Sequence, residues 1–237
     1  MSVIDASDLL LNGGIDVQGR LVDASNATLY CTATLEGESA VCVYKPVSGE
    51  RPLWDFPTGT LAARERATYL VSEAGGWHLV PPTVLRDGPF GPGMVQLWID
   101  VDDTVDLVNL VRSRHPDLRR MAVLDAVVNN ADRKGGHLLP RPSGQVMGID
   151  HGVTFAAESK LRTLLWQWAG EPLDDESVDA LEHLDHTLTK GELLDQLRGL
   201  LTRREIAATR ARVSTMLRAG VHPEPPTDWP AIPWPPF

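Results

Sequence analysis

The segment NNADRKGGHLL, residues 129–139, concentrates reactive side chains directly after an apolar run, MAVLDAVV. Asp132, Arg133, Lys134 and His137 fall within six positions, and a further carboxylate, Asp150, follows in the stretch MGID. Imidazole nitrogen and carboxylate oxygen are both ligands of divalent cations. If the fold brings His137 and Asp150 together, the pair indicates a cation site with Asp132 as a second acid close by.

A short hairpin is the element that would bring these two side chains together. The Ser-Gly pair at 143–144 can form a turn between HLL and MGID, and counting outward pairs Leu138 with Ile149 and His137 with Asp150. Cross-strand partners have Cβ atoms about 4.5–5.5 Å apart. A register shift of one residue would turn one partner to the other face. Taken singly, the histidine is more typical of a hydrogen-bonding surface residue, and the aspartate is equally typical of a turn cap.

The first third of the chain is expected to form strands. ATLYCTATL and SAVCVYKP alternate apolar and β-branched residues on either side of EGE, which is typical of two strands joined by a tight turn. A two-residue turn at 36–37 places Cys31 opposite Cys42, and Lys45 lies near the end of the second strand.

One helix is expected in this part of the chain. Thr60 can cap a helix over residues 61–74, which the pair Gly75-Gly76 would end, and Glu65 lies on an apolar stripe at four-residue spacing. HLVPPTVLRDGPFGPGMVQLWI predicts two more strands around a Gly/Pro turn, followed by an acidic linker, DVDDTVD.

From residue 105 the chain is expected to be mainly helical. Capping boxes pair Thr189 with Glu192 and Thr202 with Glu205, and Gly220 would end the last helix. The periodicity predicts helices near 105–113, 117–129, 160–169, 175–186, 190–200 and 203–219. The proline-rich tail should be extended, and it either lies along the body through Trp229, Trp234 and Phe237 or is mobile.

This order of elements predicts an α+β protein of two lobes. Residues 1–101 would form an N-lobe of antiparallel strands plus one helix, residues 102–221 a helical C-lobe with the catalytic hairpin, and residues 222–237 the tail. A ligand cleft between such lobes is the default expectation.

Composition limits the classes of function. The chain has 237 residues, with 43% apolar and 23% charged residues, as in a folded protein. A net charge of −10 argues against a nucleic-acid partner but is compatible with a small anionic ligand in a locally basic cleft. Two cysteines provide no disulfide framework or cysteine-rich zinc site. With no signal-peptide pattern and no membrane-length apolar run, we expect a cytoplasmic protein without a transmembrane segment.

Several of these motifs resemble the phosphoinositide 3-/4-kinase-like superfamily of atypical kinases, in a small bacterial-type form. NADRKGGHLL followed by GIDHG is similar to its catalytic loop and metal motif. VCVYKP is similar to its lysine strand, LAARERATYLVSE to the following helix, and GMVQLWID to its hinge strand, especially that of type II phosphatidylinositol 4-kinases. The matches occur in the expected order over roughly residues 25 to 155.

The resemblance implies a two-lobed protein-kinase-like fold and an ATP-dependent, divalent-metal-assisted kinase with a hydroxyl acceptor. It assigns Asp132 and Arg133 to catalysis, with Asp132 receiving or orienting the acceptor proton, and His137 and Asp150 to the metal. Lys45 would contact phosphates and pair with Glu65. The nucleotide contacts that it implies are Ser25, Asn26, Lys45, Glu65, Gln96, Leu97, Trp98 and Ile99.

Two departures from the family pattern bear on activity. The family usually has asparagine where this chain has His137; because Mg²⁺ prefers oxygen ligands, we expect Mn²⁺ to be favoured over Mg²⁺. The stretch VDASNATLY lacks a G-x-G-x-x-G pattern, so it is either a phosphate contact through Ser25 and Asn26 or a plain turn, and we expect modest nucleotide affinity or slow turnover.

The acceptor remains open between a lipid head group and a protein, including the chain itself. HGVTFAAESKLRTLLWQW, after Asp150, has few basic residues, whereas the lipid kinases have a basic segment there. A serine/threonine protein kinase of the bacterial toxin-type layout, a nucleotide-binding pseudokinase and a metal-dependent hydrolase are the alternatives. RSRHPDLRR, residues 112–120, is either a solvated helix junction or a dock for an acidic ligand. A peripheral position at a membrane also stays open.

Overall fold

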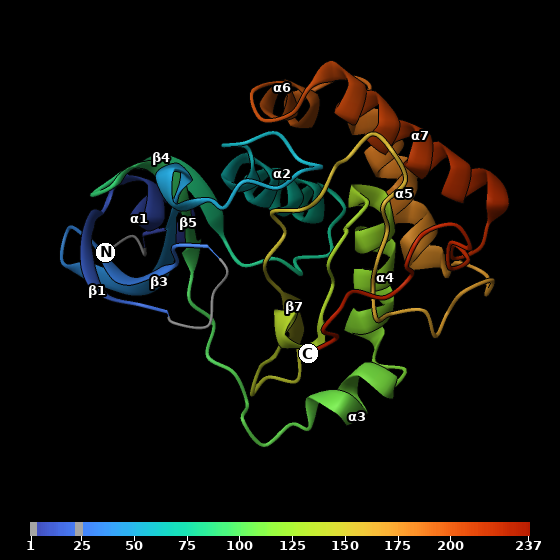
Figure 1. Ribbon diagram of the computed structural model, residues 1–237, viewed down its shortest axis with the longest axis horizontal. Coiled ribbons are helices and arrows are strands. Elements are labelled where there is room, and N and C mark those ends of the chain that lie inside the picture. Colours follow the sequence, from blue (N-terminus) through green and yellow to red (C-terminus); the bar gives the residue numbers. More distant parts are fainter. Residues whose placement is uncertain (1–3, 22–25) are drawn as a thin grey trace.

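The structure is a computed structural model that describes residues 4–21 and 26–237. Figure 1 shows an antiparallel sheet at one end of the molecule and a group of helices at the other, with helix α2 between them. The sheet has the strand order β1-β2-β3-β5-β4. Its elements are α1 (Ala6–Asn12), β1 (Gly14–Arg20), β2 (Leu29–Leu35), β3 (Glu38–Pro46), α2 (Leu61–Ala74), β4 (Thr83–Gly88) and β5 (Gly91–Leu97). These elements form the N-lobe.

The β2–β3 hairpin confirms the predicted turn and register. Cys31 is opposite Cys42, and Glu36 has a φ of 51°, as a tight turn of this hand requires. Both cysteines and Tyr44 are fully buried against α1. Because successive strand residues face opposite sides of a sheet, Lys45 faces away from that core.

Helix α2 has the predicted bounds, but its N-terminus is stabilised differently from the prediction. The Thr60 hydroxyl donates to the carbonyl of Pro57 and does not cap the helix. The backbone N–H groups of Leu61 and Ala62 donate instead to the Glu50 carboxylate at 3.2 and 2.9 Å. A negative charge at the positive end of the helix dipole replaces the local cap.

The C-lobe surrounds helix α4. It contains α3 (Leu107–Arg112), α4 (Pro116–Val128), the hairpin β6 (Leu138–Pro140) and β7 (Val146–Gly148), α5 (Asp175–Thr187), α6 (Glu192–Arg198) and α7 (Arg203–Ala219). Helix α4 is buried around most of its circumference, and it ends where Asn129 adopts a φ of 54°. Helix α7 has the predicted Thr202–Glu205 capping box and ends at Gly220, whose φ of 67° suits glycine.

The predicted helix over residues 160–169 is wrong. This stretch is irregular, and its first half is held by backbone bonds to a distant loop: Arg162 donates to the carbonyl of Asn130 at 2.9 Å and accepts from the N–H of Arg133 at 3.1 Å. Tertiary partners therefore take the backbone groups that a helix would have paired internally.

The predicted capping box of Thr189 with Glu192 is also wrong. The Thr189 hydroxyl donates to the carbonyl of Asp185, at the end of α5. Gly191 then occupies the N-cap of α6 without a side-chain hydrogen bond. Thr189 therefore bonds to the last turn of α5, and it lies two residues before the N-cap position of α6, so it cannot cap α6.

Four arginines of the stretch 112–120 were candidates for a ligand dock. Three of them form ion pairs within the C-lobe: Arg114 with Glu171, Arg119 with Asp174 at 3.3 Å, and Arg120 with Glu176 at 2.8 Å. Their pairing favours the interpretation as a helix junction.

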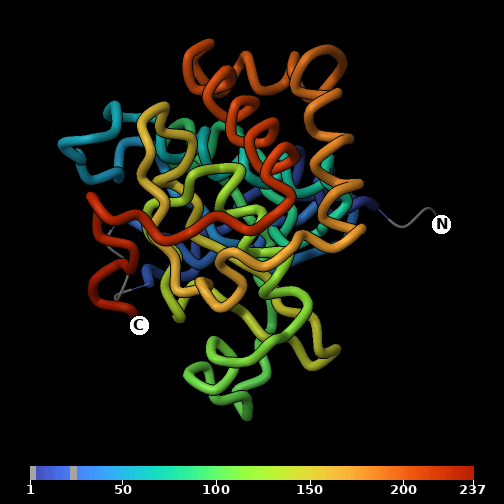
Figure 2. Tube along the Cα trace, turned by 90° about the vertical axis from the view of Figure 1, so that its right-hand side faces the viewer, coloured from blue at the N-terminus to red at the C-terminus, as the bar shows by residue number. Residues whose placement is uncertain are grey.

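The chain after α7 returns along the C-lobe, as the red trace in Figures 1 and 2 shows, and ends beside Gly135. Trp229 is half-buried and Phe237 packs on Gly135, whereas Trp234 is 86% exposed. Of the two alternatives for the tail, the structure therefore shows the one in which it lies along the body, through Trp229 and Phe237 but not through Trp234. In the described parts of the chain, no helix is long and apolar enough to cross a bilayer.

Candidate functional site

A cavity of about 670 Å³ lies between the sheet and the C-lobe. Its lining comes from the sheet, from the segment that connects the lobes and from the loop after α4 with the β6–β7 hairpin: Leu21, Asn26, Thr28, Val43, Lys45, Gln96–Val101, Asp103, Asp132, Lys134, His137, Leu139, Ile149 and Asp150. A larger groove of about 920 Å³ along α7 is lined by arginine, leucine, isoleucine and small residues, with no carboxylate or imidazole. The interlobe cavity is therefore the candidate site.

Lys45 extends from β3 into this cavity between two carboxylates. Its Nζ atom lies 2.7 Å from Glu65 Oε1 and 3.0 Å from Asp150 Oδ1. Burial by itself would lower the pKa of Lys45, but Asp150 and Glu65 outweigh it and raise that pKa above its ordinary value. Glu65 lies behind the lysine and also accepts the backbone N–H of His151 at 2.8 Å. Lys45 is thus a fixed positive charge at the cavity wall.

The β6–β7 hairpin has a different register from the predicted one. β6 and β7 pair Leu138 with Gly148, one residue away from the predicted partner Ile149. The reason is the turn: Arg141 donates its N–H to the carbonyl of Gln145 at 2.8 Å, so three residues separate the closing pair and not two.

His137 and Asp150 nevertheless meet, with Nε2 and Oδ2 3.3 Å apart. Neither residue belongs to a strand. His137 ends a 3₁₀ turn over Gly135–His137, and Asp150 has a φ of 60°, a left-handed conformation uncommon outside glycine. The predicted proximity is confirmed, but backbone geometry beyond the strand ends produces it.

His137 and Asp150 could bind a cation together with ligands from a bound nucleotide or from water. Burial lowers the pKa of His137, so its imidazole is neutral at neutral pH, and the positive charge of Lys45 lowers the pKa of the Asp150 carboxyl against the opposing effect of desolvation. Within the described residues no group of three His, Cys, Asp or Glu side chains could hold a metal. Further ligands would have to be phosphate oxygens or water, and the hydrolase alternative has no third protein ligand.

The position of the proton on the His137 imidazole limits cation binding at this site. The backbone N–H of Lys134 donates to Nδ1 at 3.4 Å. In the neutral imidazole the proton then belongs on Nε2, which faces Asp150. A cation that binds Nε2 must displace that proton.

Asp132 lines the cavity, with its side chain 27% exposed. The side-chain oxygen of Asn130 accepts its backbone N–H at 3.0 Å and fixes the start of the loop. Lys134 Nζ lies 3.1 Å from the Asp132 carboxylate and lines the same cavity. Lys134 was not among the predicted site residues, although its position two residues after Asp132 indicated that it could lie in the same site.

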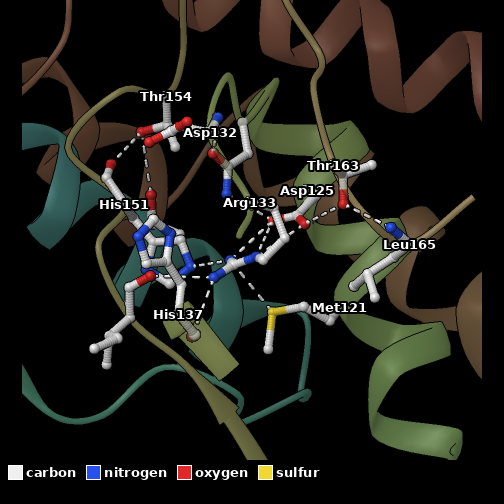
Figure 3. Close-up of polar contacts among 12 residues, drawn as sticks. Met121, Asp125, Asp132, Arg133, His137, His151, Thr154, Thr163 and Leu165 are labelled. Carbon is white, nitrogen blue, oxygen red and sulfur yellow. Dashed lines mark hydrogen bonds and ion pairs between the residues drawn. The ribbon is translucent and has the colours of Figure 1, made fainter. Parts of the chain in front are cut away.

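Arg133 does not reach the cavity. It is fully buried, and Figure 3 shows its guanidinium between the Asp125 carboxylate and the imidazole of His151. It lies 2.9 Å from Asp125 Oδ1 and donates to the carbonyl of Ile149 at 3.1 Å. The structure thus places Arg133 beneath the loop, where it joins α4 to the segment that contains Asp150. Asp125 was not predicted as a site residue, since a single acid in the run MAVLDAVV is indistinguishable from a helix-surface residue.

The other assigned nucleotide contacts lie in different positions. Asn26, Leu97, Trp98 and Ile99 line the cavity. Gln96 also lines it, but its amide donates to Thr83 Oγ1 at 2.8 Å, inside the sheet. Glu65 lies behind the wall, and Ser25 lies outside the described residues.

The segment that connects the lobes keeps backbone donors for a ligand, among them the N–H of Ile99. Leu97 and Trp98 donate their N–H groups to the carbonyls of Pro82 and Val41, while the N–H of Ile99 has no protein acceptor in the described structure. The Trp98 ring packs edge-on against Tyr30 at 5.1 Å and is 37% exposed. Two acids that were interpreted only as linker residues, Asp100 and Asp103, line the cavity beside it.

Sequence comparison finds relatives of this chain, although no family model matches it. Protein Rv2133c of Mycobacterium tuberculosis (strain ATCC 25618 / H37Rv) is 47% identical over 268 residues, which cover 98% of this chain and 96% of that protein. Phosphatidylinositol 4-kinase gamma 4 of Oryza sativa subsp. japonica is 26% identical over 196 residues. That match covers 66% of this chain and 35% of the rice protein.

Solved structures of kinases share the fold. The Golgi casein kinase with Mn/ADP bound superposes with a TM-score of 0.55 at 13% identity, over 89% of this chain and 73% of that one. Hydra Fam20 with sugar superposes with a TM-score of 0.56 at 13% identity, over 92% of this chain and 89% of that one. The Helicobacter pylori proinflammatory kinase CtkA superposes with a TM-score of 0.53 at 10% identity, over 90% of this chain and 94% of that one. At these identities the likeness concerns the fold, and it confirms a two-lobed, α+β, kinase-like architecture.

Proposed function

This chain belongs to the family of the mycobacterial protein Rv2133c, and we propose that it is an ATP-dependent phosphotransferase that acts on a hydroxyl acceptor. One observation carries the proposal: Lys45, Asp132 and Asp150, from distant parts of the chain, line a single interlobe cavity. Phosphoryl transfer needs mainly positioning and neutralisation of the charged triphosphate. A fixed lysine, a candidate cation site and an acid in the cavity wall supply these functions.

Each residue has a distinct role in this proposal. Lys45 binds phosphate oxygens and is held by Glu65. His137 and Asp150 hold a divalent cation, which when bound would neutralise charge on the phosphates. Asp132 accepts or orients the proton of the acceptor hydroxyl, and Lys134 balances the charge of that carboxylate. Arg133 positions the loop from below and does not touch the substrate.

The adenine ring would lie between apolar side chains of the two lobes. Val43 lines the cavity from the sheet, and Leu139 and Ile149 line it from the hairpin. The N–H of Ile99, which has no acceptor among residues 4–21 and 26–237, provides a hydrogen-bond donor at the connecting segment. Apolar walls with few polar groups are typical of a small-molecule site.

We further place the chain near the phosphoinositide 3-/4-kinase-like superfamily, which the motif order and the match to the rice kinase support. The acceptor we favour is a protein hydroxyl, including one of this chain. Two cations after Asp150 are already used internally: Lys160 pairs with Asp55 at 2.8 Å, and Arg162 donates to the carbonyl of Ala131 at 2.6 Å. A phosphoinositide head group would need such cations free.

A nucleotide-binding pseudokinase is the second candidate, because of the proton on His137. If Nε2 keeps its proton against Asp150, a cation cannot use the imidazole, and binding without turnover would result. Metal-dependent nucleotide binding without phosphoryl transfer is the result that would select this candidate.

The test is incubation with γ-labelled ATP and Mn²⁺ or Mg²⁺, with the chain alone, with generic protein acceptors and with phosphatidylinositol vesicles. Asp132→Asn and Asp150→Ala should abolish label transfer. Asp195→Asn, whose side chain is 69% exposed on α6, is the matched control and should retain it. Transfer that survives in both site variants, or an absence of nucleotide binding, would refute the proposal.

A further inference from the structure

The last residues of the chain lie against the loop that contains Asp132. The backbone N–H of Gly135 donates to the carbonyl of Pro236 at 2.8 Å. The Phe237 ring covers the same glycine so closely that an added Cβ would lie 2.1 Å from a ring carbon. Only glycine at 135 permits this contact, because real Cβ atoms do not approach carbon at that distance.

A second contact fastens this C-terminal segment, residues 229–237, to the chain beside the loop. The carbonyl of Ala231 accepts the backbone N–H of Thr163 at 3.0 Å and the indole N–H of Trp166 at 2.9 Å. Thr163 forms a parallel bridge with Arg133, and its hydroxyl donates to Asp125 Oδ2 at 3.2 Å. Figure 3 shows this threonine beside the buried Arg133–Asp125 pair. The C-terminal segment thus bonds to the network that supports the loop.

A third contact lies on the other side of Asp132. The Trp229 ring lies 5.0 Å from Lys160 Nζ and 5.6 Å from Arg162 Cζ, both within the range of cation–π attraction. Arg162 in turn donates to the carbonyl of Ala131, the residue that precedes Asp132. The C-terminal segment therefore supports the loop on both flanks of the proposed catalytic acid.

From these contacts we propose that Trp229, Ala231, Pro236 and Phe237 hold the Asp132 loop in place, with Phe237 as a positioning residue for that loop. The inference rests on the proposed function. The loop contains two adjacent glycines, Gly135 and Gly136, whose backbone is permissive without outside support. Neither Pro236 nor Phe237 lines the nucleotide cavity, so their loss should affect turnover and leave nucleotide binding unchanged.

The test uses variants of the full chain that remove the contact from either side. Phe237→Ala deletes the ring, and Gly135→Ala displaces it by adding a Cβ. Phe237→Tyr keeps the ring and should retain both the exchange rate of the loop and the kcat of the unmodified chain. Gly136→Ala is the steric control, since nothing lies within 4 Å of its added Cβ. Trp234→Ala, at an 86% exposed position in the same segment, is the activity control.

Two readouts separate this inference from the proposed function. Hydrogen exchange of a peptide covering residues 129–139 needs no nucleotide, and we expect it to be about tenfold faster in Phe237→Ala and in Gly135→Ala, but not in Gly136→Ala or Trp234→Ala. In the transfer assay, kcat should fall by roughly tenfold to a hundredfold, with the KM for ATP changed by less than about twofold. The double variant, Phe237→Ala with Gly135→Ala, should have a kcat no lower than that of either single variant, because both substitutions remove the same contact.

Unchanged exchange in Phe237→Ala would overturn the contact itself. Faster exchange with unchanged kcat would overturn the positioning role. If the unmodified chain transfers no phosphate, the proposed function and the positioning role both fail, while the exchange experiment still shows whether the segment holds the loop.

Discussion

Glu65→Gln is the substitution whose effect follows most directly from the structure. Glu65 is 3% exposed at its side chain and lies 2.7 Å from Lys45 Nζ. A hydrogen bond to a charged group contributes about 1.5–3 kcal/mol, and removal of one partner of a buried ion pair costs about 3–5 kcal/mol when the other charge is left uncompensated. Because Asp150 remains 3.0 Å from the lysine, we expect the lower range, about 2 kcal/mol of unfolding free energy.

That loss should be visible in thermal unfolding and in nucleotide binding. For a chain of this length, about 2 kcal/mol corresponds to a fall in Tm of about 4–8 °C. In the variant, Lys45 is drawn to Asp150 alone and is less available to phosphate. We therefore expect the Kd for ATP in the presence of Mn²⁺, measured by titration calorimetry, to rise by about tenfold to thirtyfold, or about 1.4–2 kcal/mol.

Glu73→Gln on the same helix is the matched control. Glu73 pairs with His78 at 2.9 Å, but the two side chains are 34% and 65% exposed. Exposed pairs contribute about 0–1 kcal/mol, so this variant should change neither Tm nor Kd appreciably. If Glu65→Gln behaves like Glu73→Gln in both measurements, the reasoning about Lys45 is wrong. If only Tm falls, Glu65 is structural and does not serve the nucleotide site.

Three further predictions follow from other contacts of the site and its supports. His137→Asn replaces a nitrogen ligand by an oxygen ligand, so the ratio of Mg²⁺-supported to Mn²⁺-supported transfer should rise by about tenfold; an unchanged ratio would remove His137 from the cation site. Asp125→Asn leaves Arg133 buried without a carboxylate, and urea unfolding should show a loss of about 3–5 kcal/mol, whereas a loss below about 1 kcal/mol would mean that the pair contributes little. His222 is 2% exposed and burial lowers its pKa, so the unfolded chain binds a proton that the folded chain does not. Stability should therefore fall as the pH drops below about 6.5, by up to about 1.4 kcal/mol per pH unit, and urea midpoints should fall less steeply in His222→Gln.

Local patterns in the sequence determined much of the fold. The β2–β3 hairpin, the bounds of α2 and the capping box of α7 were all predicted correctly. Each depends on residues a few positions apart, such as the turn at Glu36 and Gly37 or the pair Thr202 and Glu205. Interactions at this range are formed by the chain wherever it lies in the fold, so a single sequence is enough to recognise them.

The candidate site was predicted in composition but not in construction. Lys45, Asp132, His137 and Asp150 do line one cavity, as the resemblance to known motifs implied. The hairpin register was wrong by one residue, and the proximity of His137 to Asp150 depends on backbone conformations outside the strands. A turn of three residues cannot be distinguished from a turn of two by composition alone.

Only the tertiary structure decided which residues support the site. Asp125 and Arg133 pair within the core, residues 160–169 are irregular and not helical, and the C-terminal segment reaches Gly135 through Pro236. In each case a buried charge or backbone group is satisfied by a partner that is far away along the chain. Such groups must be paired once water is excluded. Periodicity and propensity describe only residues that are neighbours in the sequence, so the identity of a distant partner is determined by the tertiary packing alone.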